Sequence, residues 1–368
     1  MQQASEHYKP GLLPLSWLYG CGVYVRNKLF DWDIFKQTTF PNTPIICVGN
    51  ISVGGTGKTP HIEYLIRLLQ ERYKVAVISR GYKRKTTGFV LASESSTPEE
   101  IGDEPCQIKM KFPSVTIAVD GNRKRGIEKL LALPEEDRPD IILMDDGFQH
   151  RWVKPSLSII LSDNNNPVYE DKLLPAGRLR EALSSLQRAS VVLATKCSPD
   201  MKPIDMRITM NSFGLFPYQS LMFTCMKYGK LTPINSSSKT LDLHEIVGRT
   251  LILVTGIAHP EPLQRKLAEF SSTIMHIELP DHHDFGNADI ETIQELLADL
   301  PDDSAFVITT EKDIVKLRGM NLPEEIEKVL YYLPIEVEFL NEEEKLSFNK
   351  KILNHVRKNS RNSRIHKK

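Results

Sequence analysis

A glycine-rich segment at residues 47–60, CVGNISVGGTGKTP, carries residue types that suit contact with phosphate. The apolar run Ile45–Val48 leads into it and a helical pattern follows, so the segment joins a buried strand to a helix. Glycines let backbone N–H groups turn toward phosphate oxygens, and the helix N-terminus adds partial positive charge. Lys58 can reach the β- and γ-phosphates, and the Thr59 hydroxyl can bind Mg²⁺. The expected ATP contacts are Ser52, Val53, Gly54, Gly55, Thr56, Gly57, Lys58 and Thr59.

Two consecutive acids, Asp145 and Asp146, follow the apolar run Ile141–Met144. Ligands of open α/β sheets bind at the carboxyl ends of the strands, so both carboxylates are expected beside the phosphate loop. There they can hold Mg²⁺ directly or through water.

The loop departs from the usual G-x-x-x-x-G-K-[ST] pattern, because Ser52 stands where its first glycine is expected. This departure indicates a specialised branch of phosphate-loop proteins.

These groups must be positioned by alternating short strands and helices. In the first 210 residues the expected strands are Ile45–Val48, Val75–Ser79, Val115–Val119, Ile141–Met144, Leu157–Leu161 and Val191–Ala194. A helix between two of them carries Ile62, Leu65, Ile66 and Leu69 on one face. A weaker alternation after 235–239 places strands at Leu251–Val254, Ile274–Leu279, Ala305–Ile308 and Val329–Leu333. The fold class is therefore α/β, with a P-loop NTPase-like parallel-sheet domain and a second, smaller α/β domain.

The expected organisation has four parts. They are an N-terminal helical segment at 1–35, a phosphate-loop core at 36–210, a smaller α/β domain at 211–350 and a basic tail at 351–368. The boundary between the two domains falls within 205–245, where Met, Pro, Ser and turn residues interrupt the pattern. The tail contains seven Lys or Arg residues and no acid, as in a solvated arm or a frayed helix end.

Composition excludes several classes of protein. Lys plus Arg and Asp plus Glu both number 47 in 368 residues, so no global basic field favours a nucleic-acid partner. Five cysteines without a C-x-x-C pair argue for a reducing compartment and against a zinc module. No apolar run reaches 18 residues, so no membrane-spanning helix is expected. Residues 11–25 are uncharged and rich in Leu, Trp and Tyr, which suits either an interfacial membrane helix or an ordinary helix on the core.

The motif at 145–150, DDGFQH, together with GGTGKTP resembles the tetraacyldisaccharide 4'-kinases of lipid A biosynthesis. The resemblance extends over about residues 10–340. It also includes SRGY at 79–82, GDEP at 102–105, PAGRLRE at 175–181, GI at 256–257, DHH at 281–283 and TEKD at 310–313.

This resemblance implies an Mg²⁺-dependent transfer of the γ-phosphate of ATP to the 4'-hydroxyl of a tetraacyldisaccharide 1-phosphate. It implies a peripheral protein on the cytoplasmic face of the Gram-negative inner membrane, attached by its N-terminal helix. The expected partners are an acylated disaccharide lipid and a membrane surface, with no nucleic acid and no obligate protein partner.

Residue roles carry over from the matching motifs. Asp103 matches the base that accepts the hydroxyl proton, although its flanking Gly and Pro also suit a turn or N-cap aspartate. His282 matches the partner of that base, with His283 one residue away as the alternative. The expected catalytic residues are Asp103, His282 and Lys58. The expected metal ligands are Thr59, Asp145, Asp146 and Glu104, the last acting indirectly. The expected substrate contacts are Arg80, Gln149, His150, Arg178, Arg180 and Glu181.

Two other functions remain compatible with the motifs. One is a P-loop kinase or ATPase with a soluble small substrate, which has no need of the uncharged N-terminal segment. The other is a nucleotide-gated regulator. The segment 195–198, TKCS, only partly matches the guanine-binding N-K-x-D pattern, and a base candidate such as Asp103 argues against a simple switch.

Overall fold

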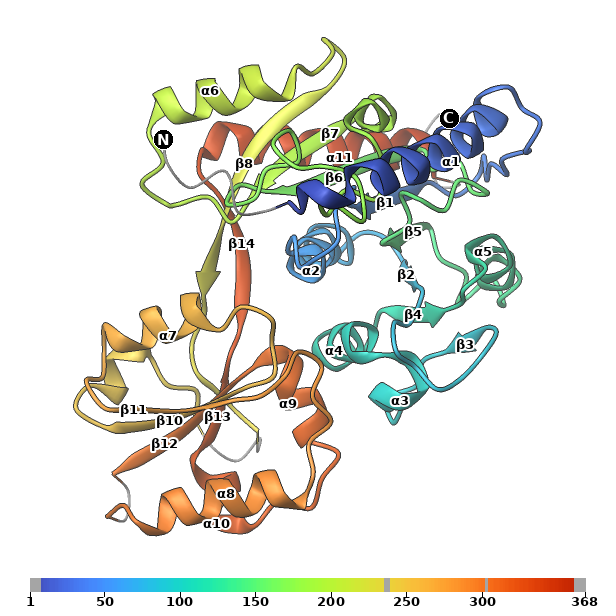
Figure 1. Ribbon diagram of the computed structural model, residues 1–368. Helices are drawn as coiled ribbons and strands as arrows, with labels where there is room; N and C mark the ends of the chain where they lie inside the picture. Colours follow the sequence, from blue (N-terminus) through green and yellow to red (C-terminus); the bar gives the residue numbers. More distant parts are fainter. Residues whose placement is uncertain (1–7, 235–238, 302–303, 361–368) are drawn as a thin grey trace.

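The computed structural model describes residues 8–234, 239–301 and 304–360. Within these ranges the strands form one sheet of nine strands and one of five, which lie in two separate bodies in Figure 1. Every strand predicted from an apolar run is present, with ends that agree within two residues. The prediction of an α/β fold with a second, smaller α/β domain is confirmed.

The larger sheet forms the core. In spatial order its strands are β14 (Ile335–Phe339), β8 (Ser220–Tyr228), β7 (Val191–Thr195), β6 (Leu157–Asp163), β1 (Ile45–Gly49), β5 (Ile141–Asp145), β2 (Val75–Ser79), β4 (Thr116–Val119) and β3 (Val90–Leu91). Neighbours are parallel except at the two edges, where β14 pairs antiparallel with β8 and β3 with β4. Because β1 lies beside β5 and β5 beside β2, the carboxyl ends of these three strands meet at one edge.

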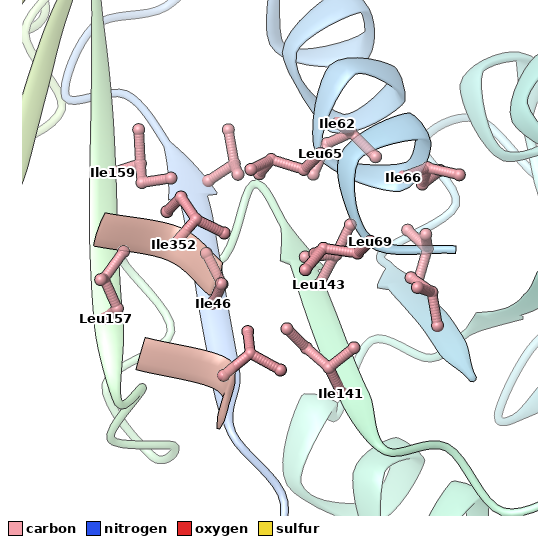
Figure 2. Packing of buried hydrophobic residues seen from close by; sticks show 14 of the residues in the cluster. Ile46, Ile62, Leu65, Ile66, Leu69, Ile141, Leu143, Leu157, Ile159 and Ile352 are labelled. Atoms are coloured by element: carbon pink, nitrogen blue, oxygen red, sulfur yellow. The ribbon is translucent and has the colours of Figure 1, made fainter. Parts of the chain in front are cut away.

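Helices cover both faces of the core sheet. One face carries α2 (Lys58–Leu69), α4 (Asp103–Lys111) and α11 (Glu342–Asn359), and the other carries α5 (Arg123–Leu131), α6 (Pro203–Phe213) and the short η2 (Leu183–Arg188). The predicted apolar face of α2 is confirmed, since Ile62, Leu65, Ile66 and Leu69 are at most 1% exposed. Figure 2 shows Leu69 beside Leu143 of the sheet, in the apolar cluster that also contains Ile46 and Ile159. This packing fixes the direction of the helix that begins at the phosphate loop.

The second domain has its own sheet, in the order β11 (Ile274–Glu278), β10 (Thr250–Thr255), β12 (Ala305–Thr310), β13 (Leu330–Leu333) and β9 (Thr232–Pro233). Helix α7 (Glu261–Ala268) packs on one face, and α8 (Asn287–Ala298), α9 (Glu311–Leu317) and α10 (Glu324–Val329) pack on the other. Ile101, Cys106 and Val119 of the core belong to the same apolar cluster as α9, so the two domains share buried surface. The remaining short elements are η1 (Pro10–Leu12), α3 (Pro98–Ile101) and η3 (Leu243–Ile246).

The sheets divide the chain differently from the expected boundaries at 211 and 350. Strands β8 and β14 belong to the core sheet and run side by side toward the second domain (Figure 1). Helix α11 also packs on the core, through Phe348, Ile352 and Val356. Residues 351–359 of the expected tail are the end of this helix, while 1–7 and 361–368 lie outside the described residues. The apolar spacing of four residues explains the docking, because it puts one stripe of α11 on the sheet.

Helix α1 (Leu13–Asp31) lies against the segment 173–181. It is not apolar enough to cross a bilayer, and the same is true of the other helices in the described ranges. Its only buried side chains are Ser16 and Phe30.

Candidate active site

The phosphate loop occupies residues 50–57 between β1 and α2. Gly54 and Gly57 have φ values of 105° and 82°, which side-chain-bearing residues rarely adopt. A Cβ at Gly57 would also collide with the methyl group of Met226 on β8. The loop is fixed from outside, because the Val53 N–H donates to Arg178 O at 2.8 Å and the Arg180 N–H donates to Ile51 O at 2.6 Å.

Ser52 takes part in the same contact between the loop and the 178–180 segment, because it forms an isolated antiparallel β-bridge with Leu179. Its φ is not positive and its side chain is buried. The first glycine of the usual pattern is therefore not required here, because the 178–180 segment holds this position as extended backbone.

The two acids at the end of β5 have different surroundings. Asp145 is buried and its Oδ2 accepts a hydrogen bond of 3.0 Å from the Ser79 hydroxyl at the end of β2. Burial and the neighbouring Asp146 raise the pKa of Asp145 to about 6. Asp146 is partly exposed; burial would raise its pKa, but Lys58, 3.7 Å away, and Arg180, at 3.1 Å, hold it below the usual range. Asp146 is thus charged at neutral pH.

The sheet edge that carries Asp145 and Asp146, the acid edge, fits a hard cation. Asp145 Oδ1 is buried and has no hydrogen-bond partner in the described part of the chain, and an unpaired buried carboxylate oxygen is costly unless a ligand satisfies it. Lys58 and Thr59 begin α2 on the adjacent strand end, so the Thr59 hydroxyl is available to the same ion. Three or more His, Cys, Asp or Glu side chains do not converge anywhere in the described ranges. Mg²⁺ in a phosphate-loop site does not require such a cluster, because phosphate oxygens and waters supply most of its ligands.

The 175–181 segment supports the loop more than it lines an open surface. The guanidinium of Arg180 donates to Ser52 O at 3.1 Å, to Asp146 and to the Asn50 side chain. Arg178 pairs with Asp171 at 3.0 Å. Glu181 is only 1% exposed and pairs with Arg26 and Arg188, which differs from the expected substrate contact, because both its oxygens are engaged inside the protein.

Three other expected substrate contacts lie around the acid edge. Gln149 donates to Asn50 O at 2.8 Å. Burial and the nearby Arg123, Arg26 and Arg80 lower the pKa of His150 to about 4, so its imidazole is neutral at physiological pH. Arg80 is exposed at the end of β2, directly after the serine that contacts Asp145. Of this group, Arg80 has the side chain most open to a bound molecule.

Asp103 begins α4 and meets the second domain. Its Oδ2 lies 2.8 Å from His282 Nδ1 and 3.2 Å from Lys316 Nζ. Burial would raise the pKa of Asp103, but the hydrogen bond from His282 and the charge of Lys316 hold it below the usual range. His283 instead contacts Asp289, with 2.9 Å between Nε2 and Oδ2. Of the two candidate histidines, His282 is therefore the one that pairs with Asp103.

The Asp103–His282 pair and the two acids beside the phosphate loop belong to one region of the molecule. Glu104, the residue after Asp103, is close enough to Asp145 for its charge to contribute to the raised pKa of that acid. The motif pieces of the second domain lie around the same region. Asp313 accepts from the Gly256 N–H at 3.0 Å and from the Thr310 hydroxyl at 2.7 Å, and the His282 N–H donates to Gly256 O at 3.1 Å. These bonds fix His282 at the carboxyl end of the second sheet.

Sequence reasoning missed Ser79, Asn50, Arg123 and Lys316. Ser79 lies within the SRGY motif, whose position at a strand end next to β5 could have indicated contact with the acids. Arg123 is 3% exposed and its guanidinium lies 3.5 Å from the Asp145 carbonyl. Lys316 had no sequence signal, because its place beside Asp103 depends on how the two domains pack.

A strand, a G-K-T loop and a helix, with an acid on the adjacent strand and a carboxylate–histidine pair closing the site, define a phosphate-loop phosphotransferase. The family model for tetraacyldisaccharide-1-P 4'-kinase matches residues 8–357. The chain therefore belongs to the tetraacyldisaccharide 4'-kinase family, as the motifs indicated.

Individual relatives agree with this assignment. A tetraacyldisaccharide 4'-kinase of Phocaeicola vulgatus is 49% identical, over 96% of both chains. One of Bacteroides thetaiotaomicron is 48% identical, over 96% of this chain and 94% of the relative. Among solved structures, LpxK from Aquifex aeolicus in complex with ATP is similar at a TM-score of 0.73 and 29% identity, covering 94% of this chain and 98% of that one. The predicted kinase class and fold are confirmed.

Proposed function

We propose that this chain transfers the γ-phosphate of ATP to the 4'-hydroxyl of a tetraacyldisaccharide 1-phosphate, with Asp103 as the base. The observation that carries the proposal is the contact between Asp103 and His282 beside a complete phosphate loop. A sugar hydroxyl is a poor nucleophile until a positioned carboxylate can take its proton. A nucleotide switch has no need of such a pair.

The residues then have distinct tasks. Backbone N–H groups of 52–57 hold the ATP phosphates, and Lys58 stabilises charge on the transferring group. Asp145, Asp146 and Thr59 would hold Mg²⁺, with Glu104 nearby, and the ion supplies charge neutralisation on the phosphates. Asp103 takes the hydroxyl proton while His282 fixes its carboxylate. Arg80 is the guanidinium best placed to grip a phosphate of the disaccharide, because its side chain is exposed at the site.

Phosphate transfer tests this proposal directly. Purified protein in detergent is incubated with γ-labelled ATP and a tetraacyldisaccharide 1-phosphate, and the product is mapped by mass spectrometry. We expect label on the 4'-oxygen, no transfer to a substrate blocked at that hydroxyl, and little transfer after Mg²⁺ is chelated. Phosphorylation of soluble sugars in place of the lipid would favour the alternative of a soluble-substrate kinase.

We also propose that α1 attaches the protein to the cytoplasmic face of the inner membrane. The side of α1 that touches the protein is largely polar: Ser16 donates to Leu173 O at 2.9 Å, Tyr19 to Arg180 O at 2.9 Å, and Arg26 to Gln149 O at 3.2 Å. The opposite side is apolar and open, with five side chains between 52% and 71% exposed: Leu15, Trp17, Leu18, Tyr24 and Val25.

A helix with its polar side toward the protein and its apolar side outward suits a lipid surface. There apolar and aromatic groups enter the interface while Lys and Arg stay near the headgroups. An acylated substrate loses about 0.8 kcal/mol per CH₂ on leaving the bilayer for water, so the enzyme must come to the membrane. Because Tyr19 and Arg26 contact the backbone beside the phosphate loop and the acids, an α1 lying on the bilayer would bring the site close to the lipid.

A membrane-binding assay tests this role of α1. Replacing Leu15, Trp17 and Leu18 with Gln should reduce binding to anionic vesicles and lower activity on vesicle-embedded substrate more than on detergent-dispersed substrate. Ile204→Gln is a matched control, because it changes an apolar side chain on α6 that is 57% exposed. Unchanged vesicle binding in the triple variant would assign the attachment to another surface.

A further inference from the structure

Lys316 is a second group from the other domain that contacts the base. It lies on α9, its side chain is 10% exposed, and its Nζ is 3.2 Å from Asp103 Oδ2. The same ammonium donates to the carbonyl of His283 at 2.8 Å and lies 3.7 Å from Asp284 Oδ1. A nearly buried lysine with three oxygen neighbours has a fixed position, since moving it would leave a cation without partners.

Both donors from the second domain meet the same oxygen of Asp103. His282 Nδ1 and Lys316 Nζ lie 2.8 and 3.2 Å from Oδ2. In the described part of the chain no hydrogen bond involves Oδ1, and the carboxylate is 11% exposed. A carboxylate gripped by one oxygen has a fixed plane, and its other oxygen is left for an incoming proton donor.

The two donors share one rigid framework. Asp313 lies one helical turn before Lys316 on α9 and is bound to the Gly256 N–H, while the Gly256 carbonyl accepts from the His282 N–H at 3.1 Å. Thr310 caps α9 by accepting from the Asp313 N–H at 3.1 Å. His282 has a φ of 63°, an uncommon value for a residue with a side chain, and this framework maintains it. The spacing between the imidazole and the ammonium is thereby set before Asp103 meets them.

We propose that Lys316 is a positioning residue for phosphate transfer: together with His282 it fixes Oδ2 of Asp103 and so directs Oδ1 at the attacking hydroxyl. This inference rests on the proposed function. In the step it supports, the hydroxyl proton passes to Oδ1 as the sugar oxygen bonds to the γ-phosphorus. The bond from that phosphorus to the β–γ bridging oxygen breaks, and ADP leaves with its electron pair. Lys316 touches neither reactant.

Two substitutions separate positioning from general support. Lys316→Met keeps most of the length of the side chain and removes the ammonium, whereas Lys316→Arg keeps a cation and donors. Steady-state kcat and KM are measured for ATP and for the tetraacyldisaccharide 1-phosphate in detergent. We expect Lys316→Met to lower kcat by roughly 10- to 100-fold, the order that a small misplacement of a reacting group costs, with KM for ATP within about twofold. Lys316→Arg should recover part of the loss.

The matched control is Lys266→Met, which removes the same charge from α7 of the same domain, where Lys266 pairs with Glu269 at 2.6 Å. The kcat of this variant should equal that of the unmodified protein. The decisive comparison is made in an Asp103→Ala background, with long incubations that quantify residual transfer. There Lys316→Met should cause no further loss, because a residue that acts only through Asp103 has nothing left to position.

The kinetic outcomes separate this inference from the proposed function. Unchanged kcat in Lys316→Met, or a loss that multiplies with that of Asp103→Ala, overturns the positioning role. If Lys316→Met does not fold, as judged by its melting curve and ATP binding, Lys316→Arg in both backgrounds decides by the same additivity criterion. Failure of the unmodified chain to phosphorylate the lipid would overturn the proposed function and this inference together, whereas an active chain insensitive to Lys316→Met would overturn this inference alone.

Discussion

The site has two sides that are assembled in different ways. The phosphate side contains the phosphate loop with Asp145 and Asp146, and the base side contains Asp103, the proposed base. Lys58, Asp145, Asp146 and Arg180 all belong to the core, and their contacts with one another are made within it. Asp103 also belongs to the core, but both groups that hold its carboxylate come from the second domain. The proposed ATP site can therefore be complete in the core alone, whereas the carboxylate of Asp103, the proposed base, is held only while the two domains are docked.

An ionic cluster lies across the contact between the two domains. Lys111 of α4 lies 2.7 Å from Glu63 of α2 and 2.5 Å from Glu311 of α9, and Glu311 also accepts from the Ile335 N–H at the start of β14. The cluster thus joins the phosphate-loop helix, the helix of the base, the helix of Lys316 and a connecting strand. This comparison predicts that substitutions on the base side change turnover without changing ATP binding, and that substitutions on the phosphate side change both.

The largest effect is expected for Asp103→Ala. Removal of a general base costs about 10²- to 10⁴-fold in kcat. KM for ATP should change little, because Asp103 faces the second domain rather than the phosphate loop. Steady-state kinetics on detergent-dispersed lipid measures both. A large rise in KM for ATP would mean that the base side contributes to nucleotide binding.

The second-largest effect is expected for Lys58→Ala. The loss in kcat should be about 10²- to 10³-fold, since one donor to the transferring group is removed. ATP affinity should fall as well, in contrast to Asp103→Ala, and equilibrium binding of ATP measures this fall. Lys74→Ala, an exposed lysine beyond the other end of the same sheet, is the control and should bind ATP normally. A folded Lys58→Ala enzyme with normal turnover would exclude the loop as the ATP site.

Ser79→Ala should have a smaller effect on the phosphate side. It removes the hydroxyl that donates to Asp145 Oδ2 and leaves that carboxylate less well oriented. Loss of an outer-shell partner of a metal ligand typically costs about 10- to 100-fold in metal affinity. The Mg²⁺ concentration for half-maximal activity should rise, while activity at saturating Mg²⁺ should be largely recovered. An unchanged Mg²⁺ requirement would remove Asp145 from the metal site.

The smallest effect is expected for Glu63→Gln, and it concerns stability. Burial and the charge of Glu311 raise the pKa of Glu63 above its ordinary value of 4.5. A raised pKa means that folding favours the protonated form, so its contribution to stability is full below 4.5 and is lost as the pH rises toward neutrality. Glu63→Gln should flatten this decline in urea-unfolding midpoints.

The control for that measurement is Glu128→Gln, which changes a half-exposed acid on α5. It should keep the pH dependence of the unmodified protein. An equally steep decline in Glu63→Gln would show that another group titrates.

The sequence predicted the core strands and the placement of the phosphate loop and the two acids at adjacent strand ends, because local signals determine both. Short Val- and Ile-rich runs, the G-K-T loop and the two acids at a strand end lie within single elements. Strands β8 and β14 were missed for the opposite reason: Thr224 and Lys227 interrupt the apolar pattern of β8, and Glu336 and Glu338 alternate with Val337 and Phe339 on β14. A strand such as β14, whose exposed residues alternate with buried ones, does not resemble the continuously buried parallel strands of the core.

The base side could be predicted only in part. Asp103 and His282 were identified from family motifs, but 179 positions separate them, and the choice between His282 and His283 needed the geometry. Lys316 had no local signal. Glu181 belongs to a matching motif, yet it forms ion pairs inside the protein, because helix α1 brings Arg26 against it. Motifs therefore predicted which residues gather, and packing determined which of their side chains are engaged inside the protein.

The most direct test of the central claim is a double-mutant cycle across the domain interface with Asp103→Ala and His282→Ala. The measurements are kcat for transfer to detergent-dispersed lipid and the Kd of ATP, for both single variants, the double variant and the unmodified chain. If His282 acts through Asp103, as we propose, the double variant should be no slower than Asp103→Ala within about twofold, and all four proteins should bind ATP alike. Losses that multiply, or an ATP affinity that falls with either substitution, would contradict the account.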